Sequence, residues 1–191
     1  MQSPPTVIFL NGTPSSGKTS IARELEKFLG KGYSNILADD FLPAEFRNQL
    51  EAGLHHVDNT LQQYSPKEIW QHIQKRDLAL NEKLYRLVEQ GRNLIIENVL
   101  LIPGSVCFYK RSLVKARVFF VGVKCPLSVV MQRELSRGDR NVGMAKTVFD
   151  FVHQHGAYDL EVNSDVQNPE ECARKIHSFI LQTPNPNAFS N

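Results

Sequence analysis

Residues 12–19, Gly-Thr-Pro-Ser-Ser-Gly-Lys-Thr, fill the phosphate-loop pattern G-x-x-x-x-G-K-[ST] completely. An apolar run at residues 7–10, typical of a buried strand, precedes the loop, and apolar residues at helical spacing follow it. The glycines allow successive backbone N–H groups to point into one concavity, where the N-terminus of the next helix adds its positive dipole end. Lys18 is expected to reach the β- and γ-phosphates of a nucleotide, and the Thr19 hydroxyl to coordinate Mg²⁺.

An accidental glycine-rich turn is the alternative interpretation of this stretch. The full pattern is expected by chance in about one per cent of chains of this length, and the flanking strand and helix lower that fraction. The sequence therefore predicts a nucleoside triphosphate site. The predicted nucleotide-binding residues are Gly12, Pro14, Ser15, Ser16, Gly17, Lys18, Thr19 and Ser20.

Three carboxylates lie at or near the ends of predicted strands. Asp39 and Asp40 follow a short strand at residues 35–38, and Glu97 lies in an apolar strand at residues 94–99. A carboxylate on a buried strand needs a partner, and Mg²⁺ or its water shell is the natural one for Glu97. Strand alternation predicts that only one of the two aspartates faces the phosphate loop, where it could accept the proton of an attacking hydroxyl. The other would cap the turn or bind Mg²⁺-bound water.

An expected helix at residues 126–135 runs at its end into a basic cluster of Arg133, Arg137 and Arg140, in a region where glycines permit movement. Arginine stabilises charge on transferring phosphoryl oxygens through forked hydrogen bonds. The cluster therefore predicts a lid over the triphosphate at residues 133–146. The alternative is a solvated helix end whose positive charge the helix dipole favours.

The elements that must position these side chains alternate along the chain. Expected strands cover residues 7–10, 35–38, 94–99, 117–123 and 158–162. Expected helices follow the phosphate loop, begin at the capping box of residues 65–68, cover residues 105–113, 126–135 and 145–155, and end the chain after Asn168. Such alternation predicts a three-layer α/β fold, a mostly parallel five-stranded sheet with helices on both faces. Ligands bind at the carboxyl ends of such strands, so the separate motifs should form one site.

The chain is expected to form a single domain over residues 1–182, followed by a flexible tail at residues 183–191. Residues 42–65 show little regular pattern, which is typical of a binding loop, and we expect them to shape the substrate pocket. His55 and His56 in this loop are expected to be solvated. Trp70 is expected to pack in the core.

The composition excludes several classes of protein. The chain has 191 residues, of which 41% are hydrophobic and 22% charged, with a formal net charge of +2. The sequence has no dense basic run of the kind that binds nucleic acid, and it has no apolar stretch long enough to span a bilayer. Cys107, Cys125 and Cys172 are too far apart for a zinc motif. We therefore expect a cytoplasmic protein with no nucleic-acid or membrane partner.

Beyond these motifs, most of the chain resembles chloramphenicol phosphotransferase and related small P-loop kinases. The resemblance is strongest at residues 8–18 and 121–125, and it continues through residues 137–145, 152–153 and 158–162. It implies a P-loop kinase fold and transfer of the ATP γ-phosphate to a hydroxyl group of a small molecule. Little corresponds between residues 42 and 65, so the resemblance does not identify the acceptor.

The resemblance also implies roles for individual residues. The catalytic aspartate of the family follows the second strand, where this chain has Asp39, with Asp40 one residue away. The carboxylate that ends the family's third strand corresponds to Glu97. The arginines of the family's lid correspond to Arg133, Arg137 and Arg140. The expected catalytic set is therefore Asp39, Lys18 and these three arginines, with Thr19, Glu97 and Asp40 at the metal.

Other functions remain open at this point. A kinase for a different acceptor, such as a sugar acid, a shikimate-like compound or a nucleoside, would use the same chemistry. A nucleotide-dependent switch would need a base-reading [NT]-K-x-D motif, and its nearest match, residues 74–77, lacks the first residue and falls inside an expected helix. A non-catalytic binding module would have little need of Lys18, Thr19, an aspartate and an arginine cluster together.

Overall fold

Strands and helices alternate along the chain, as the sequence predicts. The computed structural model describes residues 3–46, 66–102, 104–137 and 143–189. In chain order the elements are β1 (Thr6–Asn11), α1 (Lys18–Leu29), β2 (Tyr33–Leu37), the 3₁₀ helix η1 (Ala38–Phe41), α3 (Pro66–Glu89), β3 (Asn93–Asn98), α4 (Ser105–Ser112), β4 (Arg117–Lys124), α5 (Leu127–Arg137), α6 (Met144–Val152), β5 (Leu160–Asn163) and α7 (Pro169–Gln182).

The five strands form one sheet in the order β2-β3-β1-β4-β5. Every neighbouring pair is parallel, and in the centre Leu10 of β1 pairs with Glu97 of β3 and Val121 of β4. All six residues of β1 are buried, as expected for a strand covered on both faces. The predicted three-layer α/β fold is confirmed, with a sheet that is wholly parallel.

The pleat of β1 divides the core into two halves. Val7 and Phe9 pack with residues of α3 and α4 on one face of the sheet. Ile8 and Leu10 pack with residues of α1 and α7 on the other. Successive side chains of a strand point to opposite faces, so each helical layer receives every second residue. Complete burial of a side chain of this size contributes about 1.5–3 kcal/mol, which holds both layers to the strands.

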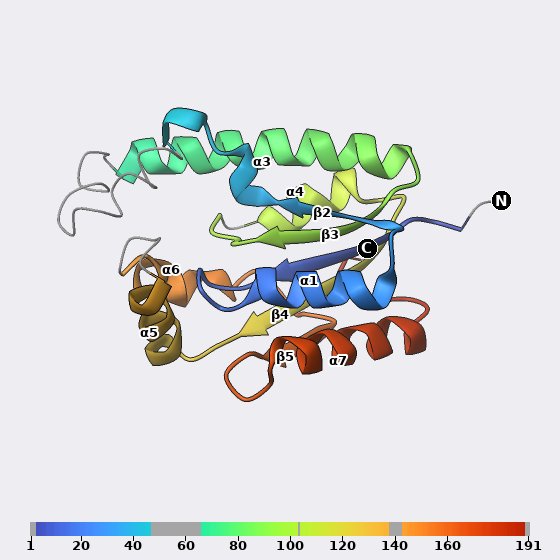
Figure 1. The fold of residues 1–191 in the computed structure, drawn as a ribbon. Helices are drawn as coiled ribbons and strands as arrows, with labels where there is room; N and C mark the ends of the chain where they lie inside the picture. The colour runs from blue at the N-terminus through green and yellow to red at the C-terminus, as the bar shows by residue number, and fades with distance from the viewer. Residues whose placement is uncertain (1–2, 47–65, 103, 138–142, 190–191) are drawn as a thin grey trace.

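Two further helices, α5 and α6, lie at the carboxyl ends of the strands (Figure 1). Helices α5 and α6 lie beyond the ends of the strand arrows, near the loop that connects β1 to α1 (Figure 1). They share a small apolar cluster that includes Val130 and Ala145. This edge therefore holds the elements that carry the predicted site. Among the described residues no helix is both long enough and apolar enough to cross a membrane.

Some local predictions need correction. Strand β2 begins at Tyr33, two residues earlier than predicted, and Ala38, predicted as its last residue, begins a 3₁₀ helix over residues 38–41. Strand β5 begins two residues later than predicted, because Asp159 makes its own hydrogen bonds to the backbone of Phe120. Trp70 is 44% exposed and not in the core. The ring of Phe46 is buried and stacks on the ring of His72 in α3.

The C-terminal segment after α7, where the sequence predicts a flexible tail, contacts the core through its described residues. The ring of Phe189 lies 5.8 Å from that of Phe9 and 5.4 Å from that of Phe120, and it packs against the α3 and α4 half of the core. The Asp159 carboxylate accepts hydrogen bonds from the backbone N–H groups of Asn187 and Ala188. These contacts place the end of the described chain on the sheet.

Candidate functional site

The phosphate loop joins the end of β1 to the start of α1. Ser15 has a φ of 60° and Gly17 a φ of 91°, and the Ser16 N–H donates to the Thr13 carbonyl at 3.2 Å. A Cβ atom on Gly12 would lie 2.6 Å from the backbone oxygen of Val123, closer than real contacts allow. Glycine is therefore required where the loop passes β4, and a left-handed residue is required where α1 begins.

Three hydroxyl groups of this loop are buried. Thr13, Ser15 and Ser16 are at most 6% exposed, and their hydroxyl oxygens have no hydrogen-bond partner within the described part of the chain. Buried polar atoms nearly always have partners, so three such atoms together mark a place prepared for an external ligand. At a helix N-terminus that ligand is an anion, and nucleotide phosphates fit the loop.

Lys18 is the first residue of α1, and its ammonium group lies against the phosphate loop. The Nζ atom donates to the carbonyl oxygens of Gly12 at 2.8 Å and of Thr13 at 2.9 Å. The ammonium is thus held as a point charge at the rim of the loop. A flexible stem lets it exchange these carbonyls for phosphate oxygens.

Thr19, Glu97 and Asn35 form a polar cluster next to the loop. The Thr19 hydroxyl donates to Glu97 Oε2 at 2.7 Å, and the Asn35 amide donates to Glu97 Oε1 at 3.0 Å. Glu97 is buried on β3 and faces α1. Hydroxyl and carboxylate oxygens are the donors that Mg²⁺ prefers, so Thr19 and Glu97 fit a magnesium site, with Asn35 holding the carboxylate in place.

In the described ranges, no group of three or more His, Cys, Asp or Glu side chains could hold a metal ion by itself. A magnesium site differs from such a cage, because Mg²⁺ keeps several waters and binds substrate phosphates. The sequence singled out Thr19 and Glu97 for this position. It did not identify Asn35, whose signal is a polar residue within a short strand.

Asp39 and Asp40 lie in η1, beyond the end of β2. Consecutive residues of a 3₁₀ helix differ by about 120°, so the strand alternation used to separate the two aspartates does not apply. Both residues are exposed. The Asp39 carboxylate lies 3.7 Å from Arg76 Nη1 of α3, which gives it a defined neighbour at this edge of the sheet.

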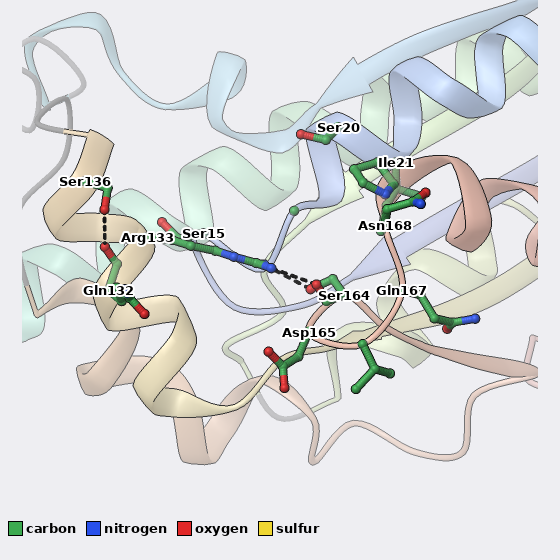
Figure 2. A pocket seen from close by; sticks show the side chains of 13 residues that line it. Ser15, Ser20, Ile21, Gln132, Arg133, Ser136, Ser164, Asp165, Gln167 and Asn168 are labelled. Carbon is green, nitrogen blue, oxygen red and sulfur yellow. Dashed lines mark hydrogen bonds between the residues drawn. The ribbon is translucent and has the colours of Figure 1, made fainter.

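Arg133 of α5 makes its contacts with the loop that follows β5. Its guanidinium donates to Ser164 Oγ at 3.1 Å and to the Ser164 carbonyl at 2.7 Å (Figure 2). The same group lies close to Gly17, since a Cβ atom there would be 3.8 Å from Arg133 Nη1. Arg133 therefore lies beside the phosphate loop and joins it to the segment that precedes α7.

A cavity of about 610 Å³ opens on this side of the phosphate loop. Its walls come from the start of α1, from α5 around Arg133 and from residues 164–169 (Figure 2). This volume is within the range of small-molecule sites. The sequence identified Ser15, Gly17 and Ser20 on one wall and Arg133 on another. It gave no signal for Ser164, whose proximity depends on the packing of β5 beside β4.

The other predicted arginines are placed less completely. Arg137 is the last residue of α5, and Arg140 lies outside the described residues. Glu134 of α5 is fully buried and accepts hydrogen bonds from the backbone N–H groups of Gly143, at 3.1 Å, and Ala145, at 2.8 Å. A carboxylate at the N-terminus of α6 fixes the two sides of the predicted lid to each other.

Asn11, immediately before the phosphate loop, joins three segments. Its buried amide group donates to the Val152 carbonyl and to the Tyr158 hydroxyl, both at 2.7 Å, while its oxygen accepts from the Leu100 N–H. His153 Nδ1 lies 2.7 Å from the same hydroxyl. Burial raises the pKa of Tyr158 to about 12, and burial, with the charges of nearby lysines, lowers the pKa of His153 to about 4. Both groups are therefore neutral at pH 7.

Two adjacent residues of α3, Arg76 and Asp77, were not among the predicted site residues, although they are buried. Arg76 donates to Asp77 Oδ1 from Nε at 3.0 Å and from Nη2 at 2.8 Å. The signal was present in the helical spacing, because Asp77 lies four residues after Ile73 and three before Leu80, on the inner face of α3. A charge on that face requires a buried partner.

Comparison with known proteins identifies the family. The sequence matches the family described as chloramphenicol phosphotransferase-like protein over residues 5–181. The chain belongs to the chloramphenicol phosphotransferase-like family. A relative from two strains of Mycobacterium tuberculosis, provisionally named an O-phosphotransferase, is 27% identical over 194 residues, which cover 96% of this chain and 86% of the relative. The chain is therefore a member of a family of P-loop phosphotransferases, as its resemblance predicts.

Solved structures confirm the P-loop kinase fold of this family member. A gluconokinase from Sinorhizobium meliloti 1021 superimposes with a TM-score of 0.66 at 17% identity, covering 95% of this chain and 94% of the gluconokinase. The APS kinase CysC of Mycobacterium tuberculosis, solved in complex with AMPPNP and APS, has a TM-score of 0.58 at 18% identity, covering 94% and 99%. At these identities the likeness concerns the fold alone.

Proposed function

We propose that this protein is an ATP-dependent kinase that transfers the γ-phosphate to a hydroxyl group of a small molecule. The observation that carries the proposal is the phosphate loop with three buried hydroxyls lacking partners among the described residues, next to the Thr19–Glu97 hydrogen bond. A loop of this kind binds phosphates, and the hydroxyl–carboxylate pair provides oxygen donors that would hold Mg²⁺. Membership of the family supports phosphoryl transfer as the reaction.

Residues of this chain divide the donor side between them. The backbone of residues 12–17 would bind the phosphates, and Lys18 would neutralise charge on the transferring group. Thr19 and Glu97 would hold Mg²⁺, which when bound neutralises the charge that develops on the β- and γ-oxygens. The cavity between Arg133 and residues 164–169 would take the nucleoside. Its size and its opening onto the phosphate loop support this assignment.

On the acceptor side, Asp39 is proposed as the general base. The acceptor oxygen attacks the γ-phosphorus, its proton passes to the Asp39 carboxylate, and the bond from the γ-phosphorus to the β,γ-bridging oxygen breaks. ADP leaves with that electron pair. Asp40 is proposed to bind Mg²⁺-bound water or cap η1. Arg137 and Arg140 are proposed to close over the triphosphate from the lid.

The acceptor is proposed to be a small hydroxylated compound, and chloramphenicol is the first candidate that the family suggests. A kinase for another hydroxylated metabolite is the second candidate, supported by the fold of the gluconokinase, which also uses the P-loop kinase architecture. A nucleotide-dependent switch is less well supported, because residues 74–77 lie within α3 and not after a strand.

An acceptor screen tests the proposal. The purified chain is incubated with ATP and Mg²⁺ over a panel of hydroxylated compounds that includes chloramphenicol, sugar acids, shikimate and nucleosides, and ADP release is measured. The Lys18→Ala variant gives the background, and Lys31→Ala, in the exposed turn after α1, is the matched control. We expect acceptor-dependent ADP release from the wild type and from Lys31→Ala only. Nucleotide binding without turnover on any acceptor would contradict the proposal.

A further inference from the structure

The inner face of α3 carries a buried ion pair at the acceptor edge of the sheet. Arg76 is 3% exposed and Asp77 is 5% exposed. Charged side chains are rarely buried to this degree, and the cost of removing them from water is large unless every group is paired. Helix α3 packs directly on η1, the element that carries Asp39 and Asp40. The pair therefore lies behind the residue proposed as the base.

One edge of the Arg76 guanidinium is firmly held. Nε and Nη2 both donate to Asp77 Oδ1, and Nη2 lies 3.3 Å from the Val99 carbonyl. The Tyr109 hydroxyl donates to the same Asp77 oxygen at 2.9 Å and accepts from the Asn98 amide at 3.2 Å. Burial raises the pKa of Tyr109, so its hydroxyl keeps its proton and remains a donor. These contacts join α3 to α4 and to the end of β3.

The remaining nitrogen, Nη1, points the other way. It lies 3.7 Å from Asp39 Oδ1, whereas the Asp39 side chain is 56% exposed. An exposed aspartate on a short 3₁₀ helix has several rotamers available. A fixed, buried positive charge beside it favours the rotamer that brings the carboxylate to the guanidinium, because the interaction is stronger where water is excluded.

We propose that Arg76 is the positioning residue of Asp39, and that Asp77, Tyr109 and Asn98 brace it. This inference rests on the proposed kinase function. Arg76 holds the base in one orientation at the acceptor end. The brace anchors Arg76 to Asn98 at the end of β3. Glu97, the residue before Asn98 in this strand, faces the phosphate loop. One strand end then sets the distance between base and phosphate. Small errors in such a distance are costly, since a displacement of about 1 Å can lower a rate about 100-fold.

The test is the Arg76→Lys substitution, which keeps the charge and loses the fork. We expect kcat for the acceptor to fall about 10- to 100-fold, while KM for ATP stays within about threefold. In the Asp39→Asn background the same substitution should change kcat less than about twofold. The effects of substituting two residues that act through one another are not additive. Arg86→Lys, an exposed arginine on the same helix, is the matched control.

Three outcomes would overturn the inference: a loss below about threefold in folded Arg76→Lys, a rise in KM for ATP that accounts for the whole loss, or losses that multiply in the double variant. If Arg76→Lys does not fold, the isosteric Asp77→Asn replaces it. That variant loosens the brace and should lower kcat in the wild-type background and not in the Asp39→Asn background. An unchanged kcat in folded Asp77→Asn would also overturn the inference.

A measurement without substrate separates this inference from the proposed function. Nitrogen-15 spectra of the arginine side chains should show the Arg76 Nη1 resonance shifting in Asp39→Asn and not in Asp40→Asn. An unshifted resonance would mean that the two residues do not interact, whatever the enzyme does. Failure of every acceptor in the screen, together with a shifted resonance, would remove the kinase proposal and leave the contact standing.

Discussion

Glu97 and Asn98 are neighbours at the end of β3, yet they serve opposite sides of the sheet. Glu97 faces α1 and accepts the Thr19 hydroxyl beside the phosphate loop. Asn98 faces α3 and α4, where it begins the chain of contacts through Tyr109 to the Arg76–Asp77 pair. The pleat of a single strand thus separates the proposed donor half of the site from the proposed acceptor half.

The two halves are prepared in different ways. The donor half comes mostly from one contiguous loop, and its buried hydroxyls have no partner among the residues that the structure describes. The acceptor half is collected from η1, α3, β3 and α4, and its buried charges are already paired with one another. We infer from this difference that the proposed donor half is completed by its ligand, whereas the proposed acceptor half is fixed before any ligand binds.

The largest effect is expected from Lys18→Ala. Loss of this charge should abolish phosphoryl transfer, by at least about 10³-fold, and weaken ATP binding, since Lys18 stabilises charge on the transferring phosphate. The thermal midpoint should stay close to that of the wild type, because the ammonium is not part of the core. Turnover and nucleotide titration measure this, with Lys31→Ala as control. Unchanged turnover would contradict the proposed role of Lys18 in the donor half.

Asp39→Asn should have the next largest effect and should act on the acceptor half alone. We expect kcat to fall about 10²- to 10⁴-fold while ATP affinity stays near normal, because the amide cannot accept the proton. Steady-state kinetics with ATP and acceptor varied in turn measure both quantities. Asp40→Asn is the matched control and should lower kcat much less. The reverse order of the two variants would make Asp40 the base.

Arg133→Ala distinguishes a lid residue from a wall of the nucleotide cavity. The contacts with Ser164 lead us to expect about a tenfold loss of kcat/KM for ATP, mainly through KM. Arg174→Ala, an exposed arginine on α7, is the control. A loss of about 10³-fold in kcat at constant KM would instead support the lid role over the transferring phosphate that the sequence predicts. A change below about threefold in both kcat and kcat/KM of Arg133→Ala would favour a solvated helix end.

The smallest effect concerns His153 and the pH dependence of stability. Its pKa is lowered to about 4 by burial first and by the charges of Lys124 and Lys18 next, with a further contribution from His155. In the unfolded chain histidine binds a proton near pH 6.5, whereas the folded chain keeps His153 neutral. The neutral ring therefore contributes stability above about pH 6.5 that is lost as the pH falls toward 4.

Urea unfolding of the wild type and His153→Gln between pH 7 and pH 4.5 measures this contribution. The wild type should lose stability more steeply than the variant across that window. His177→Gln, on α7, is the control and should follow the wild type. Parallel curves for the wild type and His153→Gln would show that the ring is protonated as readily in the folded chain as in the unfolded one.

Much of the fold and part of the site followed from local patterns in the sequence. The phosphate loop needs only its glycines and the strand and helix on either side, and α7 begins after Asn168 as predicted, with a capping box at its start. Gly91, with a positive φ, follows the end of α3 at Glu89, as a glycine after a helix often does. Glu97 stood out as a charge in an apolar strand. These features depend on residues within a few positions of one another, so backbone hydrogen bonding and side-chain period determine them.

Other features depend on how distant parts of the chain pack together. The 3₁₀ turn at Asp39 replaced the strand continuation, because the chain leaves the sheet edge to pack on α3. Arg133 meets Ser164 only because β5 lies beside β4. Arg76 meets Asp39 only because α3 packs on η1, which follows the end of β2. No local pattern encodes such pairs. Strand order and helix packing bring together residues that are far apart in the chain, and burial then gives their charges the strength to hold a site.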